Sequence, residues 1–323
     1  MIRAASVAKL AAMSATIVAP GKGKSHWLVQ ERITSLLTPA QTGGAYEIFA
    51  AEGQPGGGPP PHRHRREDEI FYVVDGTFDF AFRDHVVRAS KGACFFLPRD
   101  VVHTYNNVGA SPGKLLVAAS PGNFSAFVAD AGEPCGDANM APPAVGPATF
   151  EKLGTACARH GIETFPDWKP TAPPPAGTPP PELWVIGQHV KMLLTGQDTR
   201  GSFSVVEVTT APGEFVPVHL HKAEDEIFYI LEGTFEFEVE GRKVFAPAGT
   251  LIHVPKRTFH GFRNAGTVPV RMLDYHTPGG FEKFFEAAGT VCEDQKLGPP
   301  KVEPDMDRLI QIFLSHGMEM GPR

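Results

Sequence analysis

The feature that most constrains this chain is an internal repeat. Shifted by 157 residues, the segment HRHRREDEIFYVVDGTFDF from His62 coincides with HLHKAEDEIFYILEGTFEF from His219. The same offset holds from Trp27 to Cys135 without a net insertion or deletion. Self-similarity at one fixed offset indicates tandem duplication of a single folding unit. The 323 residues are also enough for two domains, at roughly 150 residues per domain.

Each repeat has the residue pattern of β-strands. EIFYVV, GTFDFAF and their copies are rich in the aromatic and branched residues typical of strands. In TFEFEVE, Phe235, Phe237 and Val239 alternate with glutamates, which predicts a strand with one buried face and one solvent-exposed face. Asp75-Gly76 and Glu232-Gly233 predict hairpin turns. We therefore predict an all-β fold of two tandem antiparallel jelly-roll barrels, with short peripheral helices at FEKFFEAAG and RLIQIFLSHG.

The repeat also predicts the domain boundaries. We expect an N-terminal arm over residues 1–25, a first barrel domain with a helical tail over 26–165, and a second over 183–323. The proline-rich segment 166–182 between them predicts an extended, semi-rigid linker. Residues 1–12 are basic and free of acids, which is consistent either with a transit peptide or with an upstream start ahead of Met13.

Histidine and glutamate recur at matched spacing in both repeats. His62 and His64 are two residues apart, and residues two apart on a strand project from the same face. A glutamate follows five residues later and a third histidine 34 residues after that. The predicted metal ligands are His62, His64, Glu69 and His103 in the first repeat, and His219, His221, Glu226 and His260 in the second. Three imidazoles and one carboxylate suit a divalent transition metal, one per domain: Fe(II) or Mn(II) first, with Ni, Cu or Zn as alternatives.

At these residues the sequence resembles the cupin superfamily, whose fold is a double-stranded β-helix. Its first motif, G(x5)HxH(x4)E(x6)G, is matched by Gly56, His62, His64, Glu69 and Gly76, and by Gly213, His219, His221, Glu226 and Gly233. Its second motif, G(x5)PxG(x2)H(x3)N, is matched by Gly92, Pro98, His103 and Asn107, and by Gly249, Pro255, His260 and Asn264. The family's glycine after the proline is replaced by Asp100 and Arg257, and an arginine fits a left-handed turn less easily than glycine.

Among two-domain cupins the chain is most similar to the quercetin 2,3-dioxygenase group. That resemblance implies a metal-dependent dioxygenase acting with O2 on a flavonol-like aromatic or enolic substrate. It also implies that the ligating glutamate, Glu69 or Glu226, accepts the substrate's hydroxyl proton. Oxalate decarboxylases carry an arginine shortly before HxH, whereas this chain has Pro60 and Pro217 there. The alternatives are a non-oxidative isomerase or lyase that stabilises an enolate on the metal, and a binding or storage bicupin without chemistry.

The residues around the ligands favour an apolar substrate. Phe71, Tyr105, Phe228 and Phe262 are predicted to line the substrate pockets. The second repeat is more polar late in the barrel, where Asp274 and His276 replace Val117 and Ala119.

Composition limits the classes of binding partner that this chain could have. The formal net charge of -6 is not the basic charge expected of a nucleic-acid-binding protein. No apolar run is long enough to span a membrane. The four cysteines lack CxxC spacing and are interpreted as reduced thiols of a cytoplasmic protein, although a Cys135–Cys292 bridge is the alternative. The expected partners are a small apolar or aromatic molecule and O2, with the chain a monomer or a homodimer.

Overall fold

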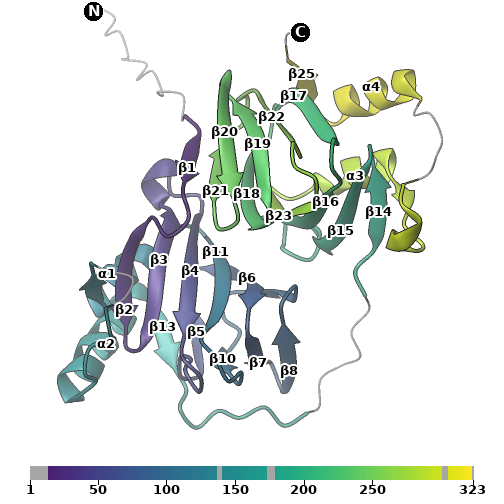
Figure 1. Ribbon diagram of the computed structural model, residues 1–323. Coiled ribbons are helices and arrows are strands. Elements are labelled where there is room, and N and C mark those ends of the chain that lie inside the picture. The colour runs from purple at the N-terminus through teal and green to yellow at the C-terminus, as the bar shows by residue number, and fades with distance from the viewer. Residues whose placement is uncertain (1–13, 137–139, 173–178, 300–304, 322–323) are drawn as a thin grey trace, which may run out of the picture.

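The computed structural model contains two stacked β-barrels joined by a long connection (Figure 1). It describes residues 14–136, 140–172, 179–299 and 305–321. The two interpretations of residues 1–12 therefore lie outside the described residues, as does the middle of the predicted linker.

The first barrel is built from two antiparallel sheets that face each other. The larger sheet has the order β12 (Glu133–Cys135), β2 (Lys24–Leu28), β3 (Glu31–Leu37), β4 (Glu47–Gly53), β11 (Gly113–Ser120), β6 (Asp68–Asp75) and β9 (Cys94–Leu97). The smaller sheet has the order β13 (Ile162–Thr164), β5 (His62–His64), β10 (His103–Asn107), β7 (Thr77–Phe82) and β8 (His85–Ser90).

The second barrel repeats this arrangement. Its larger sheet has the order β1 (Thr16–Val18), β21 (Leu251–Val254), β18 (Asp225–Glu232), β23 (Val270–Thr277), β16 (Ser204–Thr210), β15 (Gln188–Leu194), β14 (Glu182–Val185) and β24 (Thr290–Val291). Its smaller sheet has the order β20 (Arg242–Pro247), β19 (Thr234–Val239), β22 (His260–Arg263), β17 (Phe215–His221) and β25 (Met318–Met320). The predicted tandem jelly-roll fold is confirmed.

Two helices follow the last body strand of each barrel. They are α1 (Phe124–Ala131) and α2 (Pro147–His160) in the first, and α3 (Glu282–Ala288) and α4 (Met306–Ser315) in the second, with single 3₁₀ turns at Pro39–Gln41 and Gln295–Leu297. After α2, Gly161 adopts a left-handed conformation and reverses the chain. The returning strand β13 then pairs with β5, placing Ile162 opposite His64. The sequence pattern predicted a helical tail and missed this short strand.

The predicted hairpins at Asp75-Gly76 and Glu232-Gly233 are wrong. Strand β6 pairs with β11 and β9, whereas β7 pairs with β10 and β8, so the chain changes sheets at Gly76. Gly76 has a φ of 94°, and a Cβ there would lie 2.9 Å from the Cα of Gly113. The glycine is therefore required by a barrel corner, because a side chain would meet backbone.

One face of each large sheet packs against the other barrel. The buried cluster between them includes Leu37, Tyr72, Phe203 and Tyr275. The hydroxyl of Tyr46 donates a 2.9 Å hydrogen bond to Asp225 of the second barrel. The two large sheets therefore share one apolar interface.

The N-terminal arm joins the barrel that is distant in sequence. Strand β1 pairs with β21, with Ile17 opposite Ile252, and this extends the second barrel's large sheet (Figure 1). Residues 16–18 of the predicted arm are thus part of a sheet.

Three smaller predictions can be compared with the structure. Cys292 has a free thiol, so it is not bridged to Cys135. Glu236, predicted to face solvent, is buried because the charged groups of Arg263 and Lys243 contact its carboxylate. Within the described ranges, no helix has the length and apolarity needed to cross a bilayer.

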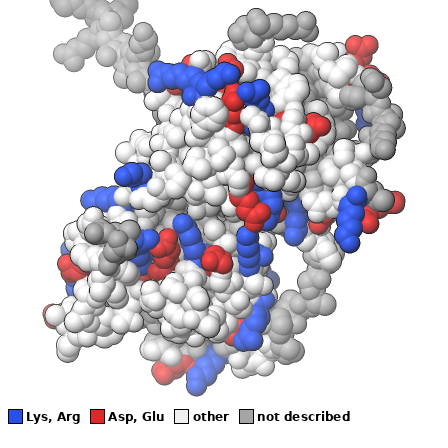
Figure 2. Space-filling model, viewed as in Figure 1, with Lys and Arg blue, Asp and Glu red and all other residues white. Residues whose placement is uncertain are grey.

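Figure 2 shows basic and acidic side chains interspersed over the face in view.

Candidate metal centres

The four predicted ligands of the first barrel converge in its interior. His62 and His64 lie at the two ends of β5, Glu69 is on β6, and His103 begins β10. The Oε2 atom of Glu69 is 3.3 Å from Nε2 of His64 and 3.2 Å from Nε2 of His103. One nitrogen or oxygen from each of the four residues lies within 4.8 Å of the others. This spacing fits four ligands around one ion.

The second set has the same arrangement. His219 and His221 are on β17, Glu226 is on β18, and His260 begins β22. The Oε2 atom of Glu226 is 3.1 Å from Nε2 of His221 and 2.5 Å from Nε2 of His260. These four residues also offer ligand atoms within 4.8 Å of one another.

Backbone carbonyls fix the orientation of the imidazoles. The Nδ1 atoms of His62 and His103 lie 2.9 and 3.0 Å from the carbonyl oxygens of Pro60 and Val101. A carbonyl can only accept, so each Nδ1 must carry a proton and each Nε2 must be the unprotonated, metal-binding nitrogen. His219 and His260 make the equivalent contacts to Pro217 and Thr258. In these four histidines the tautomer with the proton on Nδ1 is therefore set before any ion binds.

The motif turn that lacks its glycine keeps the same shape. Asp100 and Arg257 both adopt left-handed conformations, with φ of 69° and 66°. Their backbone amides donate to the carbonyls of His64 and His221, at 2.8 and 2.6 Å. This turn holds the HxH strand in place, and it has the same left-handed conformation and backbone hydrogen bond in both repeats.

Electrostatics in the first site differs between the histidines. Burial opposes a charge on His64, but Glu69 and Glu67 outweigh it and raise its pKa. Burial and the neighbouring His103 and His64 hold the pKa of His62 well below its usual value. Burial opposes ionisation of Glu69, but the histidines outweigh it and lower its pKa to about 2. Neutral imidazoles and a carboxylate are the protonation states that a metal ion requires.

Several of the converging atoms have no hydrogen-bond partner among the described residues. They include Nε2 of His64 and His103 with Oε2 of Glu69, and in the second barrel Nε2 of His260 with Oε2 of Glu226. Buried polar atoms without partners are costly, and a bound cation satisfies all of them at once. The donor set therefore fits a divalent transition metal in each barrel.

The first site opens into a large apolar cavity. The cavity measures about 470 Å³, within the range of small-molecule pockets. His62, His64 and Glu69 form part of its wall, and helices α1 and α2 close one side through Phe124, Phe127, Leu153 and Cys157.

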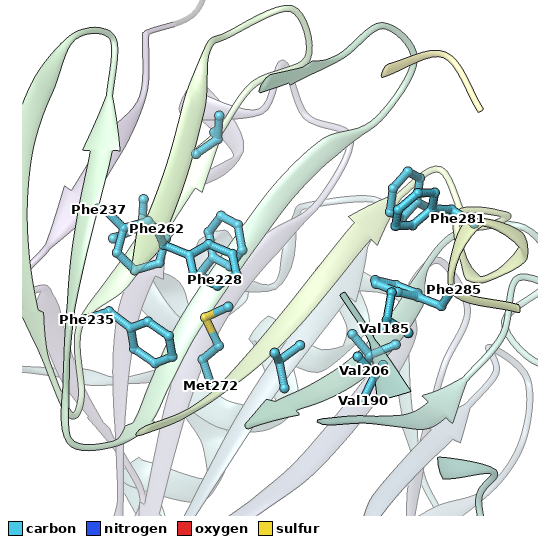
Figure 3. Close-up of a cluster of buried hydrophobic side chains, with 14 of the residues drawn as sticks. Val185, Val190, Val206, Phe228, Phe235, Phe237, Phe262, Met272, Phe281 and Phe285 are labelled. Atoms are coloured by element: carbon cyan, nitrogen blue, oxygen red, sulfur yellow. The ribbon is translucent and has the colours of Figure 1, made fainter. Parts of the chain in front are cut away.

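The corresponding cavity in the second barrel is almost filled. It measures about 60 Å³ and is bordered by Phe281, Phe284 and Phe285 of the α3 region and by Phe313 of α4. Phe313 occupies the repeat position of Cys157, and its ring centroid lies 6.3 Å from that of His219. Figure 3 shows Phe285 next to Val185, with Phe281 above them, on the opposite side of the view from Phe235 and Phe237.

The second site also has a buried polar chain behind its carboxylate. His276 Nε2 is 3.3 Å from Oε1 of Glu226, the oxygen that does not face His221 and His260. Asp274 Oδ1 is 3.7 Å from Nδ1 of His276. Burial opposes a charge on His276, but Asp274 and Glu226 outweigh it and raise its pKa. His276 is thus placed to fix the orientation of Glu226.

The predicted pocket residues do not all occupy equivalent places. Phe71 and Tyr105 line the first cavity, and Phe262 lines the second. Phe228 instead packs in the apolar core, 5.0 Å from the ring of Phe237.

Sequence reasoning missed Glu31, which lines the first cavity. Glu31 is almost completely buried and accepts a 3.1 Å hydrogen bond from Tyr105. Its signal in the sequence is a glutamate at the position aligned with Gln188 in the other repeat.

Comparison with known proteins agrees with this geometry. The family model for the cupin domain matches residues 51–119 and again residues 206–276. Both matches contain the HxH pair, the glutamate and the third histidine. The chain is a two-domain member of the cupin superfamily.

This bicupin is similar along most of its length to an enzyme. It is 24% identical over 307 residues to quercetin 2,3-dioxygenase of Bacillus subtilis, covering 90% of each chain. One repeat is 38% identical over 72 residues to germin-like protein subfamily 2 member 2 of Arabidopsis thaliana, covering 20% of this chain and 32% of that protein.

Solved structures show the same fold. Oxalate decarboxylase of Bacillus subtilis, in a structure whose description refers to its Mn(II) centres, superposes with a TM-score of 0.59 at 16% identity over 96% of this chain and 89% of that one. The oxalate decarboxylase of Lactobacillus farciminis gives a TM-score of 0.57 at 14% identity, covering 82% and 86%. At these identities the two structures show a shared fold.

Proposed function

We propose that this bicupin is a metal-dependent dioxygenase that cleaves a flavonol-like aromatic or enolic substrate in its first barrel. The observation that carries the proposal is the 470 Å³ cavity, whose wall includes three of the four candidate ligands. The 60 Å³ space in the second barrel is too small for such a substrate. The full-length similarity to a quercetin dioxygenase supports the same reaction class.

The cavity lining favours this substrate over a small dianion. Its residues include Ile33, Phe49, Phe71, Phe124 and Phe127, and neither a lysine nor an arginine lies among them. Pro60 lines the wall where oxalate decarboxylases carry an arginine before HxH. An oxalate-like dianion would lose its hydration there with no cationic side chain beside the metal ion to pair with its second carboxylate.

In the proposed mechanism, His62, His64, Glu69 and His103 hold the ion, with Fe(II) or Mn(II) preferred. The bound ion supplies the charge that polarises a substrate oxygen and the redox chemistry for reaction with O2. Glu69 is ionised and accepts the proton of the substrate's enolic hydroxyl. The apolar wall, which includes Phe71 and Phe124, contacts the substrate's rings and excludes water from the reacting centre.

The test combines metal analysis with oxygen-electrode assays on 3-hydroxyflavone. We expect one divalent ion per barrel and oxygen uptake in the wild type. H64A and H221A form a matched pair, and each should lose one ion. Only H64A should lose oxygen uptake, by about 100-fold or more, because a catalytic metal contributes several kcal/mol.

Three outcomes would contradict the proposal. Bound metal without oxygen uptake on any enol would indicate the non-oxidative isomerase or lyase chemistry, and release of CO2 from oxalate would indicate a decarboxylase. Loss of activity in H221A with retention in H64A would place the reaction in the second barrel.

A further inference from the structure

The first cavity has one polar feature that is separate from its metal ligands. Glu31 on β3 and Tyr105 on β10 both line the cavity and are joined by a 3.1 Å hydrogen bond. The surrounding wall is apolar, with Ile33, Phe49 and Phe71 among its residues. Burial raises the pKa of Glu31 to about 7, although the bond from Tyr105 opposes this rise. A carboxyl in such surroundings costs stability and needs a reason.

The second barrel shows that the fold does not need this pair. Gln188 stands in place of Glu31, and its amide oxygen accepts a 2.5 Å hydrogen bond from Thr210. Phe262 stands in place of Tyr105 and packs against Phe228 and Phe237. In the first barrel the position of Thr210 is Gly53, which has no side chain to offer Glu31. The same strands therefore form with a neutral amide and a phenylalanine.

The position of the pair defines where a ligand would meet it. Tyr105 follows the ligand His103 by two residues on β10, so both side chains project from one face, about 7 Å apart along the strand. Phe71 stands in the same relation to Glu69 on β6, and its ring centroid lies 5.7 Å from that of Tyr105. A flat molecule that reaches the ligands at one end can thus extend past Phe71 to Tyr105 and Glu31.

We propose that Glu31 and Tyr105 form a specificity site that hydrogen-bonds a second hydroxyl group of the substrate, remote from its metal-binding oxygens. The substrate class is then a flat polyphenol with oxygen atoms at both ends. This inference rests on the proposed function in taking the first cavity as the substrate site. Neither side chain takes part in the reaction, since both lie away from the atoms that would be oxidised.

The experiment measures binding without turnover. Metal-loaded protein is titrated anaerobically with 3-hydroxyflavone, 3,7-dihydroxyflavone and 3,4′-dihydroxyflavone. The wild type should bind at least one dihydroxy compound about tenfold or more tightly than 3-hydroxyflavone, as expected for a hydrogen bond to a buried polar pair. In Y105F and E31Q this preference, taken as the ratio of the two dissociation constants within each variant, should fall below about threefold, with the metal content unchanged.

The controls separate this inference from the proposed function. F262Y, the matched change in the second barrel, should leave the preference intact. A preference that survives in both Y105F and E31Q, equal loss of affinity for all three compounds, or no saturable binding would overturn the inference. Hydroxyl-dependent binding without oxygen uptake would contradict only the dioxygenase, whereas oxygen uptake without hydroxyl dependence would contradict only the specificity site.

Discussion

The two barrels share a fold and a ligand set but differ in what surrounds the ligands. In the first, Cys157 and a polar Glu31–Tyr105 pair border a cavity of about 470 Å³. In the second, four phenylalanines including Phe313 border a cavity of only about 60 Å³, and Nε2 of His276 lies 3.3 Å from the candidate ligand Glu226. The comparison shows that duplication preserved the metal ligands while the space beside them diverged. The proposed substrate site is therefore in the first barrel, and the second barrel has a more enclosed candidate metal centre.

Replacing Glu31 by the residue found in the second barrel should give the largest change in stability. Glu31 has a pKa of about 7 when folded against 4.5 in the unfolded chain. The folded state therefore binds more protons between these values, and wild-type stability falls as pH rises through that window. E31Q lacks this penalty, so it should gain up to about 3 kcal/mol over the wild type by pH 8 and little at pH 4.

Denaturant unfolding of both proteins at several pH values checks this expectation. A difference between E31Q and the wild type that does not change from pH 4 to pH 8 would show that Glu31 has an ordinary pKa.

Removing the extra histidine should make the second metal centre more like the first. H276A deletes the side chain 3.3 Å from Oε1 of Glu226, so the carboxylate loses its outer contact. Loss of an outer-shell partner typically weakens metal binding by about 10–100-fold. Competition with a chelator should show one weakened site per chain and one unchanged site. Two unchanged sites would mean that His276 does not support Glu226.

Filling the first cavity as the second is filled should reduce substrate binding. C157F places a ring where Phe313 stands in the other repeat, and it should raise the dissociation constant for 3-hydroxyflavone by about tenfold or more. C157A keeps the space open and should bind like the wild type. Metal content should stay the same in both variants, because Cys157 is not among the candidate ligands. Equal affinity of C157F and C157A would show that the ligand does not occupy this cavity.

Sequence alone was sufficient for the parts of the site that are local or repeated. The HxH pair is two residues apart on one strand, so its geometry follows from strand periodicity, and the repeat shows it twice. The cavity volumes could not be predicted, because they depend on which side chain of α2 or α4 reaches the barrel interior. Glu31 was missed for a similar reason, since its partner Tyr105 is 74 residues away.

Local signals also failed where the chain changes sheets. Asp75-Gly76 has the composition of a hairpin turn, but the strands on either side pair with other partners. Turn composition reports the conformation of two residues and not which strands become neighbours. The left-handed turn at Arg257 shows the converse, because backbone hydrogen bonding to His221 keeps a conformation that arginine seldom adopts.

The central claim is that one barrel binds substrate and the other does not. Calorimetric titration of the metal-loaded protein with 3-hydroxyflavone under anaerobic conditions measures this directly as a stoichiometry, in the wild type and in C157F. The account predicts one flavonol per chain in the wild type and a loss of that binding event in C157F. Two flavonols per chain, or one that binds C157F as tightly as the wild type, would contradict it.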